Sequence, residues 1–160
     1  MEFEIDVSGE DILNKDYTIC IANKDSIIKG FKMPREHAQI LQSNFSDGLY
    51  RYKKSKKDRA NFKVRIYSVI IYYLFKSIRV PKNIHLTICR DFAGKENDIK
   101  SNLKYLLNLR KINIMNIRYT KLDKGSAAHE YSYLMRKDIK NKMTTYVNIK
   151  VPHIEKFLKK

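Results

Sequence analysis

The order of apolar segments along the chain constrains its fold more than any other feature. Short segments with strand character come first, and helical and strand-like segments alternate after them. Strands are expected at residues 3–7, 17–22, 26–33, 84–89 and 112–119, and helices at residues 58–78, 95–110 and 126–142. Consecutive short strands pair in antiparallel fashion, whereas strands separated by a helix need parallel crossovers. The sequence therefore predicts an α/β fold of order β-β-β-α-β-α-β-α, a five-stranded mixed sheet with helices on both faces and with the first and fourth strands as neighbours.

The segments outside this alternation are short. Pro34 is expected to open a helix that ends at Leu41, and a strand at 144–151 and a helix at 152–160 close the chain. In the helix at 126–142, the residues expected to face the core are Ala127, Tyr131, Leu134, Met135 and Ile139. No repeat or low-complexity linker interrupts the 160 residues. The chain is therefore predicted to be a single domain, residues 1–160, with a core of about residues 1–142 and a C-terminal extension at 143–160.

The charge balance points to an anionic partner. The chain has 33 Lys+Arg against 17 Asp+Glu, which gives a net charge of +16. Such an excess on a small domain is self-repelling unless an anion shares the surface. Nucleic acid is the commonest partner of this kind, and an anionic membrane face is its main rival. The alternative is solubility charge combined with a Lys-, Ile- and Asn-rich coding bias.

Other features favour a cytoplasmic protein without a membrane span. No apolar run approaches the roughly 18 residues that a membrane-spanning helix needs, and residues 1–4 lack the basic-then-apolar order of a signal peptide. Cys20 and Cys89 lie in apolar runs without metal-type spacing, which is typical of reduced core cysteines. The sequence carries no signal for an oligomeric state.

One segment concentrates the positive charge and is the predicted nucleic-acid contact. Its cations are Arg51, Lys53, Lys54, Lys56, Lys57 and Arg59, and its aromatic residues are Tyr50 and Tyr52. Lysine and arginine contact phosphates without sequence preference, and tyrosine rings stack on unpaired bases. A solvated loop is the alternative interpretation of such a charge run.

Carboxylates at strand ends are the candidate metal ligands. Asp6 lies in the first strand, Asp91 follows the fourth, and Asp123 follows the fifth. Because the first and fourth strands are expected to be neighbours, these side chains are predicted to meet at one edge of the sheet, where carboxylates suit Mg²⁺ or Mn²⁺. Asp91 and Asp123 have a second interpretation as turn or capping residues. Asp6 has a second interpretation as a residue on a solvated strand face.

With these residues, the chain resembles the ribonuclease H-like superfamily, and within it the type 2 ribonucleases H. Ile5-Asp6-Val7-Ser8-Gly9 is similar to that family's opening Ile-Asp-Glu-Ala-Gly, and Lys54-Ser55-Lys56-Lys57 to its Asp-Ser-Lys-Lys segment. Asp91 matches the carboxylate that closes the fourth strand. Lys121-Leu122-Asp123-Lys124, followed by Ser126-Ala127-Ala128 and Arg136-Lys137-Asp138, is similar to a stretch with another carboxylate, a Ser-Ala-Ala helix start and a later Arg-Asp.

The chain also departs from that family. Val7 stands where the family has its second carboxylate, and Gly9-Glu10-Asp11 replaces the Gly-Arg-Gly that reads the ribonucleotide junction. Glu10 and Glu130 are candidates for the lost carboxylate. His129 is a candidate proton shuttle, with a surface or packing role as the alternative.

Two functions follow as expectations. The first is a Mg²⁺- or Mn²⁺-dependent nuclease that hydrolyses phosphodiester bonds in RNA, RNA–DNA hybrid or structured DNA by a two-metal-ion mechanism. The second is a non-catalytic nucleic-acid-binding module of the same fold. A protein–protein scaffold that meets an acidic partner is a third possibility.

Overall fold

A computed structural model describes residues 1–24, 27–90 and 92–159 of the chain. Its centre is one five-stranded mixed sheet of order β3-β2-β1-β4-β5. The strands are β1 (Glu2–Ser8), β2 (Thr18–Ala22), β3 (Ile28–Lys32), β4 (Asn83–Cys89) and β5 (Asn113–Thr120). β1, β2 and β3 pair in antiparallel fashion, and β4 lies parallel to both β1 and β5. The predicted α/β class, the mixed sheet and the neighbouring first and fourth strands are confirmed.

The helix α2 (Lys56–Lys76) forms the main support of one sheet face. Ser55 is its N-cap and accepts a hydrogen bond from the Asp58 backbone N–H at 3.1 Å. Apolar side chains surround most of the helix, so it is buried by the sheet on one side and by α3 (Glu96–Asn108) on another. The Phe75 ring meets the Phe3 ring of β1 edge-on, with centroids 5.0 Å apart. This face of the sheet holds most of the hydrophobic core.

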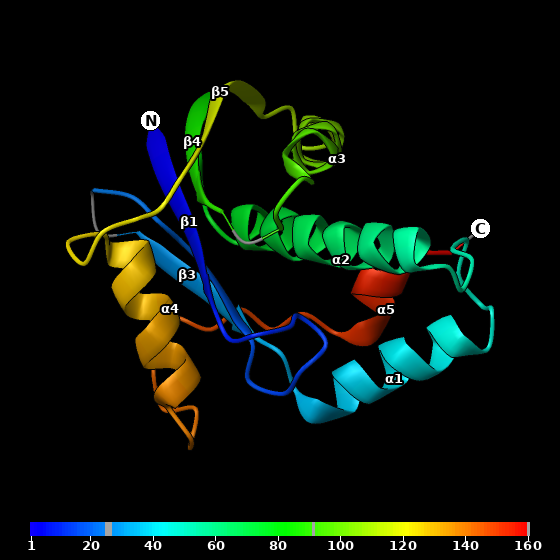
Figure 1. The fold of residues 1–160 in the computed structure, drawn as a ribbon. Helices are drawn as coiled ribbons and strands as arrows, with labels where there is room; N and C mark the ends of the chain where they lie inside the picture. The colour runs from blue at the N-terminus through cyan, green and yellow to red at the C-terminus, as the bar shows by residue number, and fades with distance from the viewer. Residues whose placement is uncertain (25–26, 91, 160) are drawn as a thin grey trace.

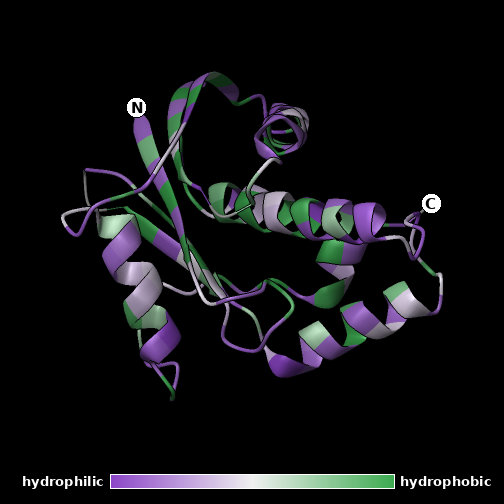
Figure 2. Cartoon of the chain, in the orientation of Figure 1, coloured by the Kyte–Doolittle hydropathy of each residue, from purple (hydrophilic) through white to green (hydrophobic). Residues whose placement is uncertain are grey.

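The helix α4 (Ala127–Lys137) covers the opposite face and contacts β1, β2 and β3. Figure 1 shows α4 on one side of the sheet and α2 with α3 on the other. In Figure 2, α4 is coloured mainly purple and pale, with little of the green that marks hydrophobic residues. Two expectations for this helix are wrong, because Leu134 is 40% exposed and Ile139 is 90% exposed beyond the helix end. The residues that α4 buries are Ala128, Ser132 and Met135.

The C-terminal part of the chain belongs to the same core. The strand expected at 144–151 is reduced to a bridge between Gly30 and Tyr146 at the outer edge of β3. The helix α5 (Val151–Glu155) follows it, and Ile149, Ile154 and Leu158 are buried in the main hydrophobic core. α5 contacts α2 and α1 (Arg35–Ser46), which extends past the Leu41 end expected from the sequence. In the described part of the chain, no helix has the length and apolar character that crossing a membrane requires.

Candidate functional site

The two faces of β1 differ in chemistry. Successive strand residues point to opposite faces of a sheet. Phe3 and Ile5 point toward α2 and are fully buried in the main core. Glu4, Asp6 and Ser8 point the other way, toward α4. A polar row on a central strand is costly when a helix covers it, unless each polar group finds a partner.

The α4 helix and its cap supply a partner for each residue of this row. The Ser126 hydroxyl, at the N-cap of α4, donates to Glu4 Oε1 at 3.2 Å. His129 Nδ1 lies 2.9 Å from Asp6 Oδ2. Beyond them, Arg136 Nε donates to the Ser8 hydroxyl at 2.8 Å. Because the partners follow one another in the same order on both elements, α4 runs along β1 in the direction of the strand.

Asp6 is the most deeply placed acid of the row, with 3% of its surface exposed. Its Oδ1 accepts the Val7 backbone N–H at 2.7 Å, and its Oδ2 contacts His129. Asp6 is opposite Cys20 in the β1–β2 register, and burial together with this carboxylate raises the pKa of the Cys20 thiol to about 12. The solvated-face interpretation of Asp6 is therefore excluded, and Cys20 stays a thiol at neutral pH.

The carboxyl ends of the parallel strands lie at the same edge as Asp6. The register pairs Ile5 with Ile88, and Cys89 with Thr120. The segments that leave β4 and β5 therefore start beside the Asp6 end of β1. Asp91, the ligand expected just after β4, lies outside the described residues.

Asp123 lies in the turn that leads from β5 into α4. Its Oδ1 accepts the Gly125 backbone N–H at 3.1 Å, and its backbone carbonyl accepts the N–H of Ser126 at 3.1 Å. These bonds are the turn role that the sequence allowed for Asp123. The Asp123 side chain is also exposed and lines a pocket together with Glu4.

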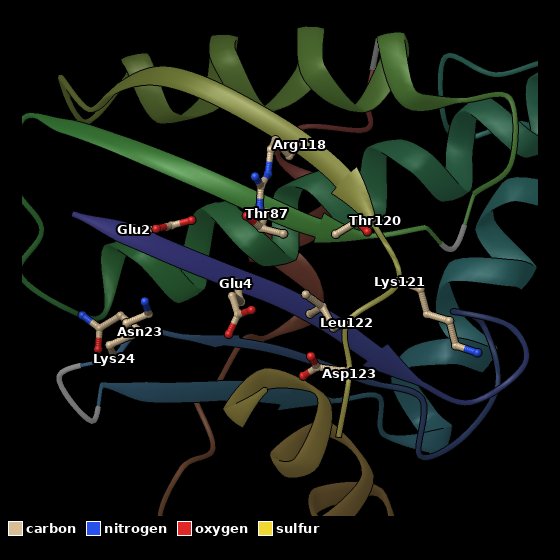
Figure 3. Close-up of a pocket in the computed structure, with 10 residues that line it drawn as sticks. All are labelled: Glu2, Glu4, Asn23, Lys24, Thr87, Arg118, Thr120, Lys121, Leu122 and Asp123. Carbon is tan, nitrogen blue, oxygen red and sulfur yellow. The ribbon is translucent and has the colours of Figure 1, made fainter. Parts of the chain in front are cut away.

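This pocket, of about 300 Å³, lies on the half of the sheet that α4 leaves uncovered. In Figure 3, Glu2 and Glu4 follow one another along β1, and the Arg118 side chain of β5 extends toward Thr87 on the neighbouring strand. The residues that line it are Glu2, Glu4, Asn23, Lys24, Thr87, Arg118, Thr120, Lys121, Leu122 and Asp123. The open face next to Asp6 is thus polar and carries both signs of charge.

The described residues fit a metal site only in part. Carboxylate oxygens are the ligands that Mg²⁺ prefers, and the buried Asp6 is of that type. Among residues 1–24, 27–90 and 92–159, however, no three His, Cys, Asp or Glu side chains are grouped closely enough to hold a metal ion. Glu10 and Glu130 are exposed and do not complete such a group with Asp6 and His129. Asp6 is therefore a buried carboxylate that hydrogen bonds hold in one orientation. The described residues do not make up a two-metal ligand set.

The predicted basic segment is divided between a loop and a helix. Lys56, Lys57 and Arg59 belong to the first turn of α2, while the residues before Ser55 form a loop. Arg51 Nη2 donates to the Tyr52 hydroxyl at 3.2 Å, and its guanidinium lies 5.3 Å from the Tyr52 ring centroid. The described cations of this segment that lie on the exposed surface are Arg51, Lys53, Lys54, Lys56 and Lys57.

Tyr50 does not present its ring to a ligand, and that expectation is wrong. Only 1% of Tyr50 is exposed, because the ring stacks against Phe62 with centroids 5.6 Å apart. Its hydroxyl donates to Glu155 Oε2 at 2.8 Å. Tyr50 therefore joins the loop to α5 as part of the core. Tyr52, which is half-buried, is the remaining aromatic of the segment.

Sequence reasoning missed a cation of α2 that contacts the loop after β1. Lys63 Nζ contacts Asp11 Oδ2 at 2.6 Å in the loop that follows β1. Burial raises the pKa of Asp11, but the hydrogen bonds from Lys63 and Leu13 and the charges of Lys63 and Arg59 outweigh it, so this pKa lies below its usual value. Lys63 stands four residues after Arg59 on the same face of α2, a spacing that was visible in the sequence. Lys63 therefore joins the N-terminal part of α2 to the loop that follows β1.

No protein-family model matches the chain, and no curated protein or solved structure is significantly similar to it.

Proposed function

We propose that this chain is a nucleic-acid-binding nuclease with a ribonuclease H-like fold, which hydrolyses a phosphodiester bond with Mg²⁺ or Mn²⁺. Asp6, Asp91 and Asp123 are the proposed metal ligands. The observation that carries the proposal is the position of Asp6: a carboxylate buried in a central strand, at the edge where three parallel strands end. Burying a carboxylate costs several kcal/mol, roughly, so a site without a use for it is expected to replace it.

The strand order supports the ribonuclease H-like part of the proposal. Three antiparallel strands are followed by parallel β4 and β5, and β1 lies beside β4. This is the arrangement that the resemblance of the opening Asp6 segment and the Asp123 segment implies.

The residues around Asp6 orient it. The Val7 N–H and His129 hold the two carboxylate oxygens from different directions, which limits rotation of the side chain. The bound metal ions would activate water and stabilise the departing oxygen. His129 uses Nδ1 for Asp6, and the second ring nitrogen, Nε2, takes no part in that contact, which leaves it as the proposed proton-shuttling atom.

The basic surface supports the choice of substrate. The chain has a net charge of +16. The exposed cations Arg51, Lys53, Lys54, Lys56 and Lys57 lie at the N-terminal end of α2, and Lys63 of the same helix contacts the loop that follows β1. Such cations bind phosphates whatever the base sequence, and their binding weakens steeply with salt.

A non-catalytic nucleic-acid-binding module is the second candidate. Val7 in the place of a carboxylate favours it, as does the lack of a three-ligand group among the described residues. Such a module would keep the basic surface and use Asp6 only to hold α4.

The test is a cleavage assay on labelled RNA–DNA hybrid, duplex RNA and branched DNA with Mg²⁺ or Mn²⁺. We expect cleavage by the native protein and its loss in Asp6→Asn, which keeps the side-chain shape and removes the charge. The control is Glu36→Gln, the same chemical change at an exposed residue of α1. Cleavage that persists in Asp6→Asn would overturn the site. Salt-sensitive binding without cleavage by the native protein would establish the module instead.

A further inference from the structure

A second hollow lies far along α2 from the basic segment. Its volume is about 420 Å³, and it lies between the C-terminal end of α2 and the segment that leads through α5. Figure 1 shows α5 lying against α2, and Tyr73, Lys76, His153 and Lys156 are the lining residues that matter here. None of these residues belongs to the Asp6 site or to the segment from Arg51 to Arg59.

The charge of this hollow has one sign. Among the residues that the structure describes, Lys76, Lys156 and His153 line it and no Asp or Glu does. In the part of the chain that the structure describes, neither lysine ammonium lies within ion-pair distance of a carboxylate. Cations gathered around a concave surface attract an anionic ligand.

The hollow also contains aromatic rings that are held in place. The Tyr73 and His153 rings lie with centroids 5.5 Å apart. The Tyr73 hydroxyl donates to the His153 backbone carbonyl at 3.0 Å, and Lys76 Nζ lies 5.7 Å from the Tyr73 ring centroid. A ring already fixed by its neighbours loses little freedom when a ligand stacks on it.

We infer that this hollow binds single-stranded nucleic acid, with a base stacked at the Tyr73–His153 pair and the adjoining phosphates on Lys76 and Lys156. The inference rests on the nucleic-acid-binding half of the proposed function and not on the metal site. An unpaired base offers its face for stacking, whereas a duplex hides the faces of its bases.

The hollow suits a nucleic acid better than an anionic membrane. Binding to a membrane surface requires apolar side chains that enter the lipid. The large hydrophobic side chains that the described surface exposes, such as Leu49, Leu109 and Ile139, are not lining residues of the hollow.

The C-terminal segment connects this hollow to the predicted basic segment. His153 contacts Tyr73, the Phe157 carbonyl accepts Arg65 Nε at 3.1 Å, and the Leu158 carbonyl accepts the Arg51 backbone N–H at 3.2 Å. The segment therefore runs back along α2 from its last turns to the loop before it. α2 has 21 residues and a length of about 30 Å at 1.5 Å per residue. A nucleic-acid strand has a phosphate every ~3.4 Å or more, so roughly nine phosphates or fewer would lie along the length of α2.

The test measures binding of labelled single-stranded oligonucleotides by fluorescence anisotropy, with EDTA present to prevent cleavage. We expect Tyr73→Leu to weaken binding of a twelve-nucleotide strand by roughly 5- to 150-fold, the usual range for losing one stacked base. Tyr73→Phe is the matched control, because it keeps the ring and loses only the hydrogen bond to His153. Its affinity should stay within about 2-fold of the native value.

A second set of variants addresses the charges without touching a buried residue. Lys76→Glu combined with Lys156→Glu should lower the slope of log affinity against log salt by about 1.4, at about 0.7 per phosphate contact in a single strand. Lys100→Glu combined with Lys104→Glu, two exposed cations of α3, is the charge-matched control. Thermal unfolding of each variant checks that the fold is retained.

The outcomes separate this inference from the proposed function. If the native protein binds single strands and Tyr73→Leu binds as tightly as Tyr73→Phe, the hollow is not the site and the proposed function stands. If the native protein binds no nucleic acid at low salt, both are overturned. Binding to phosphatidylserine vesicles that is lost in the Lys76 and Lys156 variants, without oligonucleotide binding, would assign the hollow to lipid instead.

Discussion

The two faces of the sheet are held by different interactions. On the α2 face, β1 contributes Phe3 and Ile5 to a continuous apolar core. On the α4 face, the same strand contributes Glu4, Asp6 and Ser8, each hydrogen-bonded to α4 or its cap. Apolar burial stabilises in proportion to area and tolerates small shifts, whereas buried hydrogen bonds need one geometry. The α2 face therefore supplies stability, while the α4 face fixes the position of Asp6.

The largest expected effect is on the α2 face. Phe75→Ala removes a fully buried ring that lies edge-on to Phe3. We expect the free energy of unfolding to fall by about 3–5 kcal/mol, from lost burial and the cavity left behind. Urea denaturation measures it. A loss below about 1 kcal/mol would mean that this face does not carry the stability.

On the α4 face, His129→Ala is expected to lower the free energy of unfolding by about 1–3 kcal/mol, because it removes the side-chain hydrogen bond to the buried Asp6 carboxylate. Glu130→Ala, at the next and exposed position of α4, is the control and should stay within about 0.5 kcal/mol of the native protein. Asp6→Asn should reduce the penalty of His129→Ala, since a neutral amide is less costly to bury alone. Equal stability of the two alanine variants would contradict the role of the contact.

Close approach of α4 to β3 gives a third test. A Cβ added at Gly30 would lie 2.5 Å from Met135 Cε and 3.1 Å from the Ile19 carbonyl oxygen. Gly30→Ala is therefore expected to lower the free energy of unfolding by about 1–3 kcal/mol, because the added methyl group overpacks the contact. Combining it with Met135→Ala should recover part of that loss, and a double-mutant cycle measures the coupling. Additive effects would show that Met135 is not what limits the size of residue 30.

The smallest effect concerns a polar contact outside both faces. Asp11 and Lys63 form a partly exposed ion pair with a lowered Asp11 pKa. Such a pair stabilises the fold by less than about 1 kcal/mol. Because the folded pKa lies below the usual value of 3.8, this contribution is present above that pH and is lost as the pH falls through the folded pKa. Asp11→Asn should therefore match the native stability in acid and fall below it at pH 7, as unfolding curves at both pH values would show.

The helix pattern illustrates how far the sequence allowed the fold to be predicted. For the segment at 58–78, apolar residues on most sides indicated a buried helix, and α2 is buried between the sheet and α3. For the segment at 126–142, the apolar stripe through Leu134 and Ile139 gave the wrong face. The reason is that α4 docks on a polar row, so its inner face includes Ser126, His129 and Ser132 rather than its largest apolar residues.

The order of the elements, the mixed sheet and the charge excess could all be predicted from the amino-acid sequence. These follow from local periodicity, connection length and composition, which need no knowledge of what lies across the sheet. The folded molecule alone shows that Asp6 contacts His129, that Tyr50 is buried, and that the C-terminal segment runs along α2. Such partners are distant in the chain, and hydrophobic periodicity distinguishes inside from outside without saying which polar groups meet.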